Sequence, residues 1–187
     1  MRLSLVSSLA WVALALTILP AEAAWHGYVS REAGFSFIAP GDMKAEKASY
    51  DSAIAGKRDA TVFQSVEDNI QYRVTVVDFS SRANEGDAFL KEASRTAQDR
   101  TKILADAEAR VDSNYGRKMT VDLPDNGGRS MSGIYFKDGR LIHLQATVLP
   151  ANGDYESPDP GRFIDSIVFV SSRTEPDAIE LKTPKVE

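Results

Sequence analysis

The 187-residue chain contains no cysteine. Disulfide bonds and thiol catalysis are therefore excluded, and so is attachment of a lipid to a cysteine behind an N-terminal signal. Small exported domains often depend on disulfides, so an exported domain without them has to be held together by burial of apolar side chains. The composition supplies these side chains, because 43% of the residues are hydrophobic.

Histidine is almost as scarce, since only His26 and His143 are present. An imidazole base can come only from these two residues. The closest approach to a G-x-S-x-G nucleophile motif is "GRSMS" at residues 128–132, which lacks the second glycine and leads into strands. The sequence thus contains no motif for nucleophilic hydrolysis, and a hydrolase built from carboxylates and His143 is an alternative without a motif of its own.

Dense positive charge and phosphate-binding loops are also absent. The chain has 22 Lys and Arg against 27 Asp and Glu, a net charge of −5, and its basic residues are not clustered. We therefore expect no nucleic-acid partner. Neither a G-x-x-x-x-G-K-[ST] loop nor a strand-led G-x-G-x-x-G loop occurs, so nucleotide binding through those loops has no support.

The one long apolar run lies at the start of the chain. Residues 3–19 follow Arg2, precede Pro20 and lead to Ala21-Glu22-Ala23, the small-x-small pattern of a secretory cleavage site. A run of about 17 residues is short for a membrane anchor, which is the other interpretation. We predict a signal peptide at residues 1–23 and a periplasmic or secreted protein with no transmembrane segment after cleavage.

The mature chain is long enough for one domain. We predict a single α+β domain over residues 24–170. A tail at residues 171–187 mixes charges with Pro176 and Pro184, has little to bury, and is predicted to be disordered.

Alternation of apolar and polar residues predicts most of the strands. Residues 59–80 form a hairpin around the turn at residues 67–69, and "GYVSREAGFSFIAP" contains two short extended pieces. We expect a helix over residues 87–100 with Asp87 as its N-cap, and a short helix around residues 162–166. Residues 102–111 alternate strictly but are rich in alanine, so a strand is favoured and a helix stays open. The residues expected to share a buried face of the first hairpin are Val62, Ile70, Tyr72, Val74 and Val76.

The strongest local signal is Asp138-Gly139 between two alternating runs, which is typical of a two-residue hairpin turn. Pairing about this turn sets Tyr135 opposite Ile142. It also sets His143 opposite Ile134, in a polar row with other side chains of the same strand. We therefore interpret His143 as a half-exposed or helix-covered histidine of the sheet, and as a possible surface site.

Together these elements predict an antiparallel sheet of about five to seven strands with helices packed on its faces. The segments "GFSFIAP", "DAFLKEASRTA", "YGRKMTV", "YFKDGRLIHLQATV" and "RFIDSIVF" follow one another in an order that resembles small exported bacterial proteins with the PsbP-like sandwich fold. The resemblance covers residues 34–169. It implies a protein that works by binding rather than by catalysis, and it transfers no functional residue.

Cleavage after Ala23 creates one candidate metal site. The new terminus Ala24-Trp25-His26 offers an α-amine, two amide nitrogens and an imidazole, a square-planar set that suits Cu(II) or Ni(II). Cleavage after Ala24 removes it.

The function that the sequence favours is an exported, non-catalytic accessory or binding module that recognises a protein or an envelope component. A carboxylate/His hydrolase and an N-terminal Cu(II)- or Ni(II)-binding protein are the alternatives. The oligomeric state is not determined by these patterns.

Overall fold

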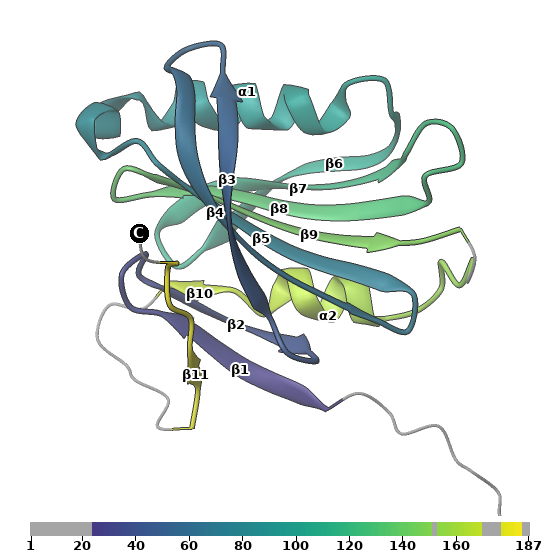
Figure 1. Cartoon of the computed structure of the whole chain (residues 1–187). Coiled ribbons are helices and arrows are strands. Elements are labelled where there is room, and N and C mark those ends of the chain that lie inside the picture. The colour runs from purple at the N-terminus through teal and green to yellow at the C-terminus, as the bar shows by residue number, and fades with distance from the viewer. Residues whose placement is uncertain (1–23, 151–152, 170–176, 185–187) are drawn as a thin grey trace, which may run out of the picture.

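The structure, a computed structural model, describes residues 24–150, 153–169 and 177–184. The fold is α+β, as predicted, with a seven-stranded and a four-stranded sheet (Figure 1). The large sheet is antiparallel, in the order β3 (Lys44–Ser52), β4 (Gly56–Glu67), β5 (Ile70–Asp78), β9 (Arg140–Val148), β8 (Arg129–Lys137), β7 (Asn114–Asp122) and β6 (Lys102–Val111). The small sheet has the order β10 (Val168–Phe169), β2 (Phe35–Pro40), β1 (Trp25–Ser30) and β11 (Ile179–Glu180).

The large sheet is covered differently on its two sides. A 3-10 segment, η1 (Ser80–Glu85), leads into α1 (Gly86–Gln98), which packs on one face. The small sheet and α2 (Asp159–Asp165) lie on the other face (Figure 1). We call these the α1 face and the inter-sheet face. The two covered faces agree with the sequence pattern, whereas the second sheet was not predicted because its short strands carry little alternation.

The Asp138-Gly139 hairpin is confirmed. Both turn residues have positive φ, 49° and 78°, and the register pairs Tyr135 with Ile142 and Ile134 with His143. Because Ile134 and Leu141 belong to the cluster packed against α1, His143 lies on the α1 face.

The first hairpin is also present, but one of the five residues predicted to share a buried face lies on the opposite face. Its turn at Asp68-Asn69 has positive φ at both residues and sets Phe63 opposite Val74, so Val62 pairs with Thr75. Ile70, Tyr72, Val74 and Val76 share the inter-sheet face as predicted. Val62 points to the α1 face instead, because the two-residue turn fixes the register.

Residues 102–111 form a strand, which resolves the open choice in favour of β6. The alternating apolar residues do not all share one face of the sheet, however. A bulge at Leu104 pairs Ile103 with Val121 but Ala105 with Thr120, which puts these two residues of β6 on opposite faces.

α1 begins one residue earlier than predicted. Its N-cap is Glu85, without a side-chain cap bond, and Asp87 lies in the first turn. Gly86 stands where a Cβ would be only 2.6 Å from Cδ1 of Phe136, so the helix can approach β8 closely only with glycine there. Because Glu85 occupies the cap position, the prediction of Asp87 as the N-cap is wrong.

The predicted disordered tail is wrong for residues 177–184. Ile179–Glu180 forms β11 in parallel with β1, the Leu181 amide donates to the Val29 carbonyl at 2.8 Å, and Leu181 is 9% exposed. Pairing with β1 and burial of Leu181 hold this segment against the small sheet. Residues 171–176 and 185–187 of that tail, and the predicted signal peptide at residues 1–23, lie outside the described residues.

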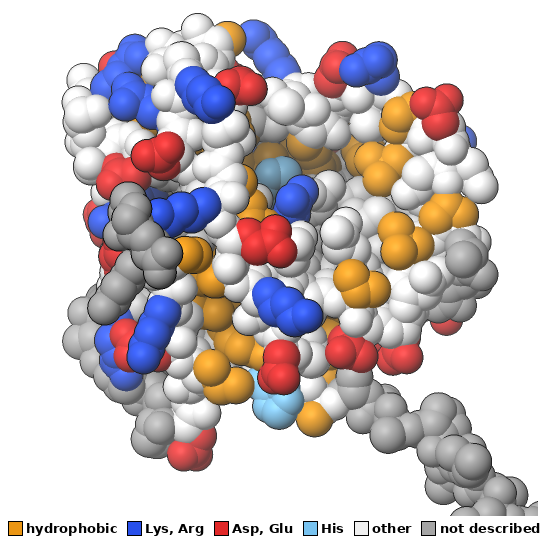
Figure 2. Space-filling view, in the orientation of Figure 1, with side chains coloured by type: hydrophobic (Ala, Val, Ile, Leu, Met, Phe, Trp, Pro, Cys, Tyr) orange, Lys and Arg blue, Asp and Glu red, His pale blue; other side chains and the backbone are white. Residues whose placement is uncertain are grey.

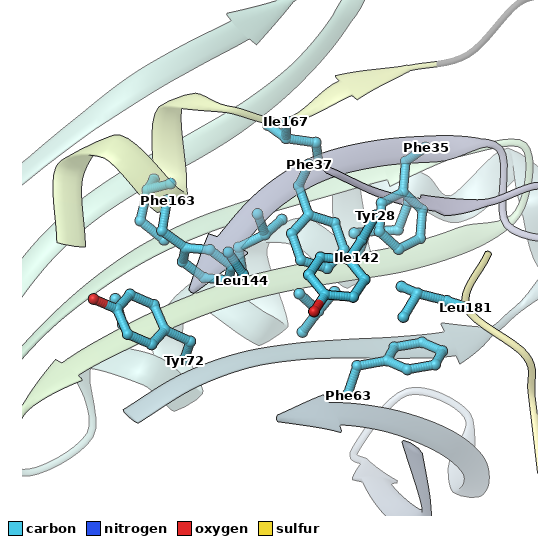
Figure 3. Close-up of a cluster of buried hydrophobic side chains, with 14 of the residues drawn as sticks. Tyr28, Phe35, Phe37, Phe63, Tyr72, Ile142, Leu144, Phe163, Ile167 and Leu181 are labelled. Atoms are coloured by element: carbon cyan, nitrogen blue, oxygen red, sulfur yellow. The ribbon is translucent and has the colours of Figure 1, made fainter. Parts of the chain in front are cut away.

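The main core fills the space between the two sheets and is strongly aromatic (Figure 3). Phe37 stacks on Tyr28 with ring centroids 5.6 Å apart and meets Phe163 of α2 edge-on at 5.7 Å. Phe163 also contacts Tyr72 edge-on at 5.3 Å. Aromatic pairs in such geometries add stability beyond the area that they bury, so this layer holds the sheets together without disulfides.

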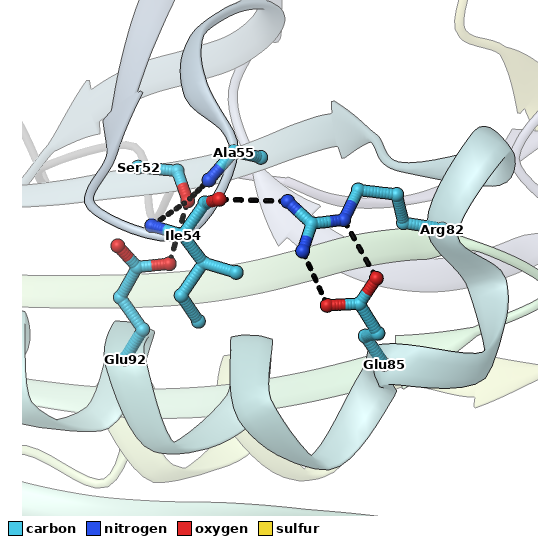
Figure 4. Close-up of polar contacts among 6 residues, drawn as sticks. All are labelled: Ser52, Ile54, Ala55, Arg82, Glu85 and Glu92. Carbon is cyan, nitrogen blue, oxygen red and sulfur yellow. Dashed lines mark hydrogen bonds and ion pairs between the residues drawn. The ribbon is translucent and has the colours of Figure 1, made fainter.

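A polar cluster ties the β3–β4 hairpin to the helices of the α1 face (Figure 4). The Ser52 hydroxyl donates to Glu92 of α1 at 2.7 Å, and the Ala53 amide donates to the same carboxylate. Arg82 of η1 donates to the Ile54 carbonyl at 2.7 Å and pairs with Glu85. The hairpin tip is therefore fixed beside α1.

Candidate functional site

Beyond the part that α1 covers, the α1 face carries hydrogen-bonding side chains, which we call the polar patch. Figure 2 shows a hollow on this side of the molecule with hydrophobic side chains and a histidine at its base. Ser130, Ser132 and Thr147 are 1%, 3% and 6% exposed. The polar patch consists of Arg73, Ser130, Ser132, His143, Gln145 and Thr147 from β5, β8 and β9.

Most hydrogen bonds of the polar patch are made within it. The Gln145 amide donates to the Ser130 hydroxyl at 3.0 Å, and the Thr147 hydroxyl lies 3.2 Å from the same oxygen. Nε2 of His143 lies 3.1 Å from Oγ of Ser132. Arg73 is the exception, because its Nε is buried without a partner in the described part of the chain.

The Ser132–His143 contact matches the first two members of a hydrolytic triad, so its electrostatics decide what it can do. Burial, followed by repulsion from the Arg73 guanidinium, lowers the pKa of His143 to about 4. In the described chain no carboxylate is bonded to the ring. A general base works best with a pKa near the working pH and with an anion that stabilises the imidazolium. Here the neighbouring charge is a cation, and the imidazole is a weak base.

His26, the other candidate of the sequence, is far from this patch in the fold. It lies on β1 and pairs with Ala39 of β2, while His143 lies on β9 across the inter-sheet core. The described residues contain no group of three or more His, Cys, Asp or Glu that could hold a metal ion. A Cu(II) or Ni(II) site at His26 depends on the cleavage point and stays a prediction, which the intact mass of the mature protein tests.

A cavity of another kind lies at one end of the space between the sheets. This inter-sheet cleft has a volume of about 460 Å³. Its floor is Phe63 and Val76, and Thr183 donates to Glu32 at 2.7 Å along one wall. Its charged lining residues are Glu32, Lys47, Asp59, Asp78 and Arg140.

Asp78 and Arg140 meet in this cleft because β5 pairs with β9 and sets them directly opposite each other. Hydrogen bonds from the Ser80 backbone amide and side chain, with smaller contributions from Arg140 and Arg58, hold the pKa of Asp78 below its usual value. The amide contact is 2.7 Å. The cleft therefore offers fixed opposite charges above an apolar floor.

No local sequence pattern predicts the inter-sheet cleft. Asp78 is the last residue of β5 and Arg140 is the first residue of β9, so each lies at a strand end and carries no pattern of its own. Their meeting requires the β5–β9 pairing, and no local pattern reports the pairing of strands more than 60 residues apart.

A smaller cavity of about 140 Å³ lies along β6, between the sheet and α2. Met131 and Ile164 form its apolar part, and the Lys118–Asp165 ion pair at 2.6 Å lies at its side. Ala105 and Ala107 of β6 complete the lining. We call it the β6 groove.

The arrangement of strands and helices has a solved counterpart. The solution structure of cyanobacterial PsbP (CyanoP) from Synechocystis sp. PCC 6803 matches with a TM-score of 0.51 and 15% identity, over 80% of this chain and 95% of that chain. The chain has a PsbP-like fold. At this identity the likeness concerns the fold alone, and it confirms the resemblance seen in the sequence.

Comparison with family models and with curated proteins found no match. Among the residues that the structure describes, no helix is long and apolar enough to cross a membrane.

Proposed function

We propose that the mature chain is an exported, non-catalytic accessory or binding module that recognises a protein or another component of the cell envelope. The observation that carries the proposal is the inter-sheet cleft. It combines an apolar floor with a few fixed charges on rigid strands, which is the usual make-up of a binding site.

The electrostatics of the polar patch argue against the hydrolase alternative. Ser132 is 3% exposed, so its hydroxyl cannot readily meet a substrate. A neutral His143 beside the Arg73 cation lacks the stabilised imidazolium that general-base catalysis needs. The histidine and serine are better explained as hydrogen-bonded parts of a folded sheet.

Export to the periplasm or out of the cell is part of the proposal. It rests on the signal-like pattern at residues 1–23, where a basic residue precedes an apolar run that ends in a small-x-small sequence. Cell fractionation and the N-terminal mass of the product test it.

Site-specific crosslinking tests the binding function. A photoreactive amino acid replaces Lys47, an exposed residue that lines the cleft, in the full chain, which is then irradiated with envelope fractions of the source cells. The matched control carries it at Lys91, an exposed position of α1 on the opposite face. We expect one discrete adduct from position 47 that is absent from position 91 and weakened by Arg140→Glu.

Equal labelling from both positions, or none, would contradict recognition through the cleft. Turnover of an ester, peptide or glycoside substrate that disappears in both Ser132→Ala and His143→Gln would replace the binding module with the hydrolase.

A further inference from the structure

Arg73 of β5 lies inside the large sheet without a hydrogen-bonding partner in the described residues. Its Nε is buried, while the side chain as a whole is only partly buried and reaches the surface. No hydrogen bond or ion pair joins the guanidinium to another residue that the structure describes. A buried donor of a charged group costs free energy when nothing accepts from it, so this position requires an explanation.

The strand register explains why the neighbours of Arg73 do not bind it. Arg73 pairs with Gln145 of β9 on one side and with Gln64 of β4 on the other. The Gln145 amide donates to Ser130 at 3.0 Å, and the Gln64 amide donates to Glu46 at 3.0 Å. Both neighbouring side chains are therefore held in bonds that do not include the guanidinium.

The charge of Arg73 is also not balanced by a bonded carboxylate. Glu46 is engaged with Gln64, and Asp106 of β6 accepts from Arg117 at 2.6 Å. Burial and the Arg73 guanidinium both lower the pKa of His143, and no described carboxylate acts on that ring in the opposite direction. The potential around His143 is therefore positive.

The polar patch has the shape of a concave site. His143 is only partly buried, yet it is enclosed closely enough for desolvation to lower its pKa to about 4. A side chain at the base of a hollow combines these two properties, and Figure 2 shows such a hollow with a histidine at its base. Val66, which follows Gln64 by two residues on the same face of β4, is 57% exposed. An apolar surface thus lies near the cation.

Arg58 provides an internal comparison, because its Nε is also buried without a partner in the described chain. It lies on β4 opposite Tyr50, toward the tip of the β3–β4 hairpin. Arg58 helps to lower the pKa of Asp78, so a carboxylate of the protein itself partly offsets its charge. Arg73 is therefore the better anchor for an anion from outside the chain.

We propose that the hollow of the α1 face binds the carboxylate of a small organic acid, with Arg73 as its anchor. The two carboxylate oxygens accept from Nε and from one terminal nitrogen of the guanidinium, a paired geometry that arginine favours with carboxylates. A monoanion matches the single charge of Arg73, and the apolar part of the acid packs on Val66. This site goes beyond the function proposed above and lies on the opposite face of the sheet from the inter-sheet cleft.

The test is a titration of the full chain with hexanoate at pH 7, followed by calorimetry and by NMR of the arginine Nε–H resonances. At this pH the acid is ionised and His143 is neutral. We expect saturable shifts of the Arg73 Nε–H and His143 ring resonances. Hexanamide, which has the same carbon chain without the charge, should cause none.

Two arginine variants locate the binding. Arg73→Gln should weaken hexanoate binding about tenfold, because a hydrogen bond to a charged group is lost. Arg58→Gln removes the other arginine with a buried, unpartnered Nε and is the matched control, which should bind as the parent does. Arg73→Lys keeps the charge but not the fork of nitrogens, and should weaken binding about threefold if the pairing is bidentate.

Three results overturn the proposal. They are equal binding of hexanoate and hexanamide, an equal loss in Arg73→Gln and Arg58→Gln, and tighter binding of inorganic phosphate than of hexanoate. An unshifted Arg73 resonance in the unsubstituted protein overturns it as well, whether or not the variants fold. Crosslinking from Lys47 reports on the cleft separately, so each proposal can fail without the other.

Discussion

The two faces of the seven-stranded sheet are built from the same strands but hold different kinds of side chain. The inter-sheet face is an aromatic layer closed by the small sheet and α2. The α1 face is apolar under the helix and polar beyond it, with a buried Arg73 Nε that has no partner in the described residues. Since neighbouring residues of a strand point to opposite faces, the same strands can supply aromatic packing to one face and both packing and hydrogen-bonding groups to the other.

The contrast between the two faces indicates where the stability of this cysteine-free domain comes from. Buried rings on the inter-sheet face gain free energy in proportion to the apolar area removed from water. Polar groups on the α1 face exchange water for protein hydrogen bonds, which yields little net stability. Substitutions on the first face should therefore cost more than substitutions on the second.

The largest effect is expected for Phe163→Ala on the inter-sheet face. Phe163 is 0% exposed and touches rings of both sheets, so its loss should lower the free energy of unfolding by about 3–5 kcal/mol. Urea denaturation measures it. Val168→Ala, at a residue 51% exposed, is the control and should change stability by less than about 0.5 kcal/mol. A loss below about 1.5 kcal/mol for Phe163→Ala would mean that the aromatic layer does not dominate.

An intermediate effect is expected from protonation of His143 on the α1 face. The ordinary pKa of 6.5 applies to the unfolded chain, and in the folded protein burial lowers it to about 4. Between these values the unfolded state binds more protons, so the free energy of unfolding falls as the pH drops from 6.5 to 4. The loss should be about 1–3 kcal/mol. His143→Gln should remove this step from the measured dependence of stability on pH.

The carboxyl groups provide the contrast for that experiment. Asp78 and Asp122 have pKa values held below 3.8, chiefly by hydrogen bonds from Ser80 and Arg129 respectively. Their contribution to stability is present above pH 3.8 and is lost as the pH falls through the lowered values. His143→Gln should leave this lower step unchanged. An identical curve for the variant between pH 6.5 and 4 would show that the imidazole is not desolvated.

The smallest effect is expected at the rim of the α1 face. Glu92→Ala removes the carboxylate that accepts from the Ser52 hydroxyl (Figure 4) and from the Ala53 amide. It should cost about 1 kcal/mol because the contact is partly exposed to water. Amide exchange at residues 52–55 should speed up, while β8 and β9 keep their protection. Lys91→Ala on the exposed side of α1 is the control. A cost as large as that of Phe163→Ala would erase the distinction between the two faces.

How much of this could be predicted from the sequence depends on how local each feature is. The Asp138-Gly139 turn fixed a register that placed His143 opposite Ile134, as the structure has it. Val62 was assigned to the wrong face because the turn that sets its register was not resolved to the residue. The tail strand β11 was missed because it is only two residues long and exists through pairing with β1.

Among the candidate functional residues, only His143 could be placed on the sheet from a local turn signal. Its contact with Ser132 follows from the β8–β9 hairpin and could have been read from the same register. The Arg73 cation beside it, and the Asp78–Arg140 pair of the cleft, come from the β5–β9 pairing. The β5–β9 pairing joins segments that are distant in the sequence. It is set by packing of the whole core, so local residue order does not predict it.

Local residue order accounts for the absence of cysteine chemistry, the alternating strands, the hairpin turns and the α+β class, because turn residues and hydrophobic periodicity act over a few neighbouring positions. Long-range packing sets the order of the strands, the second sheet, the inter-sheet cleft and the edge strands of the large sheet. These features depend on which distant strands pair and which edges stay uncovered, and that choice is made by the packing of the whole core.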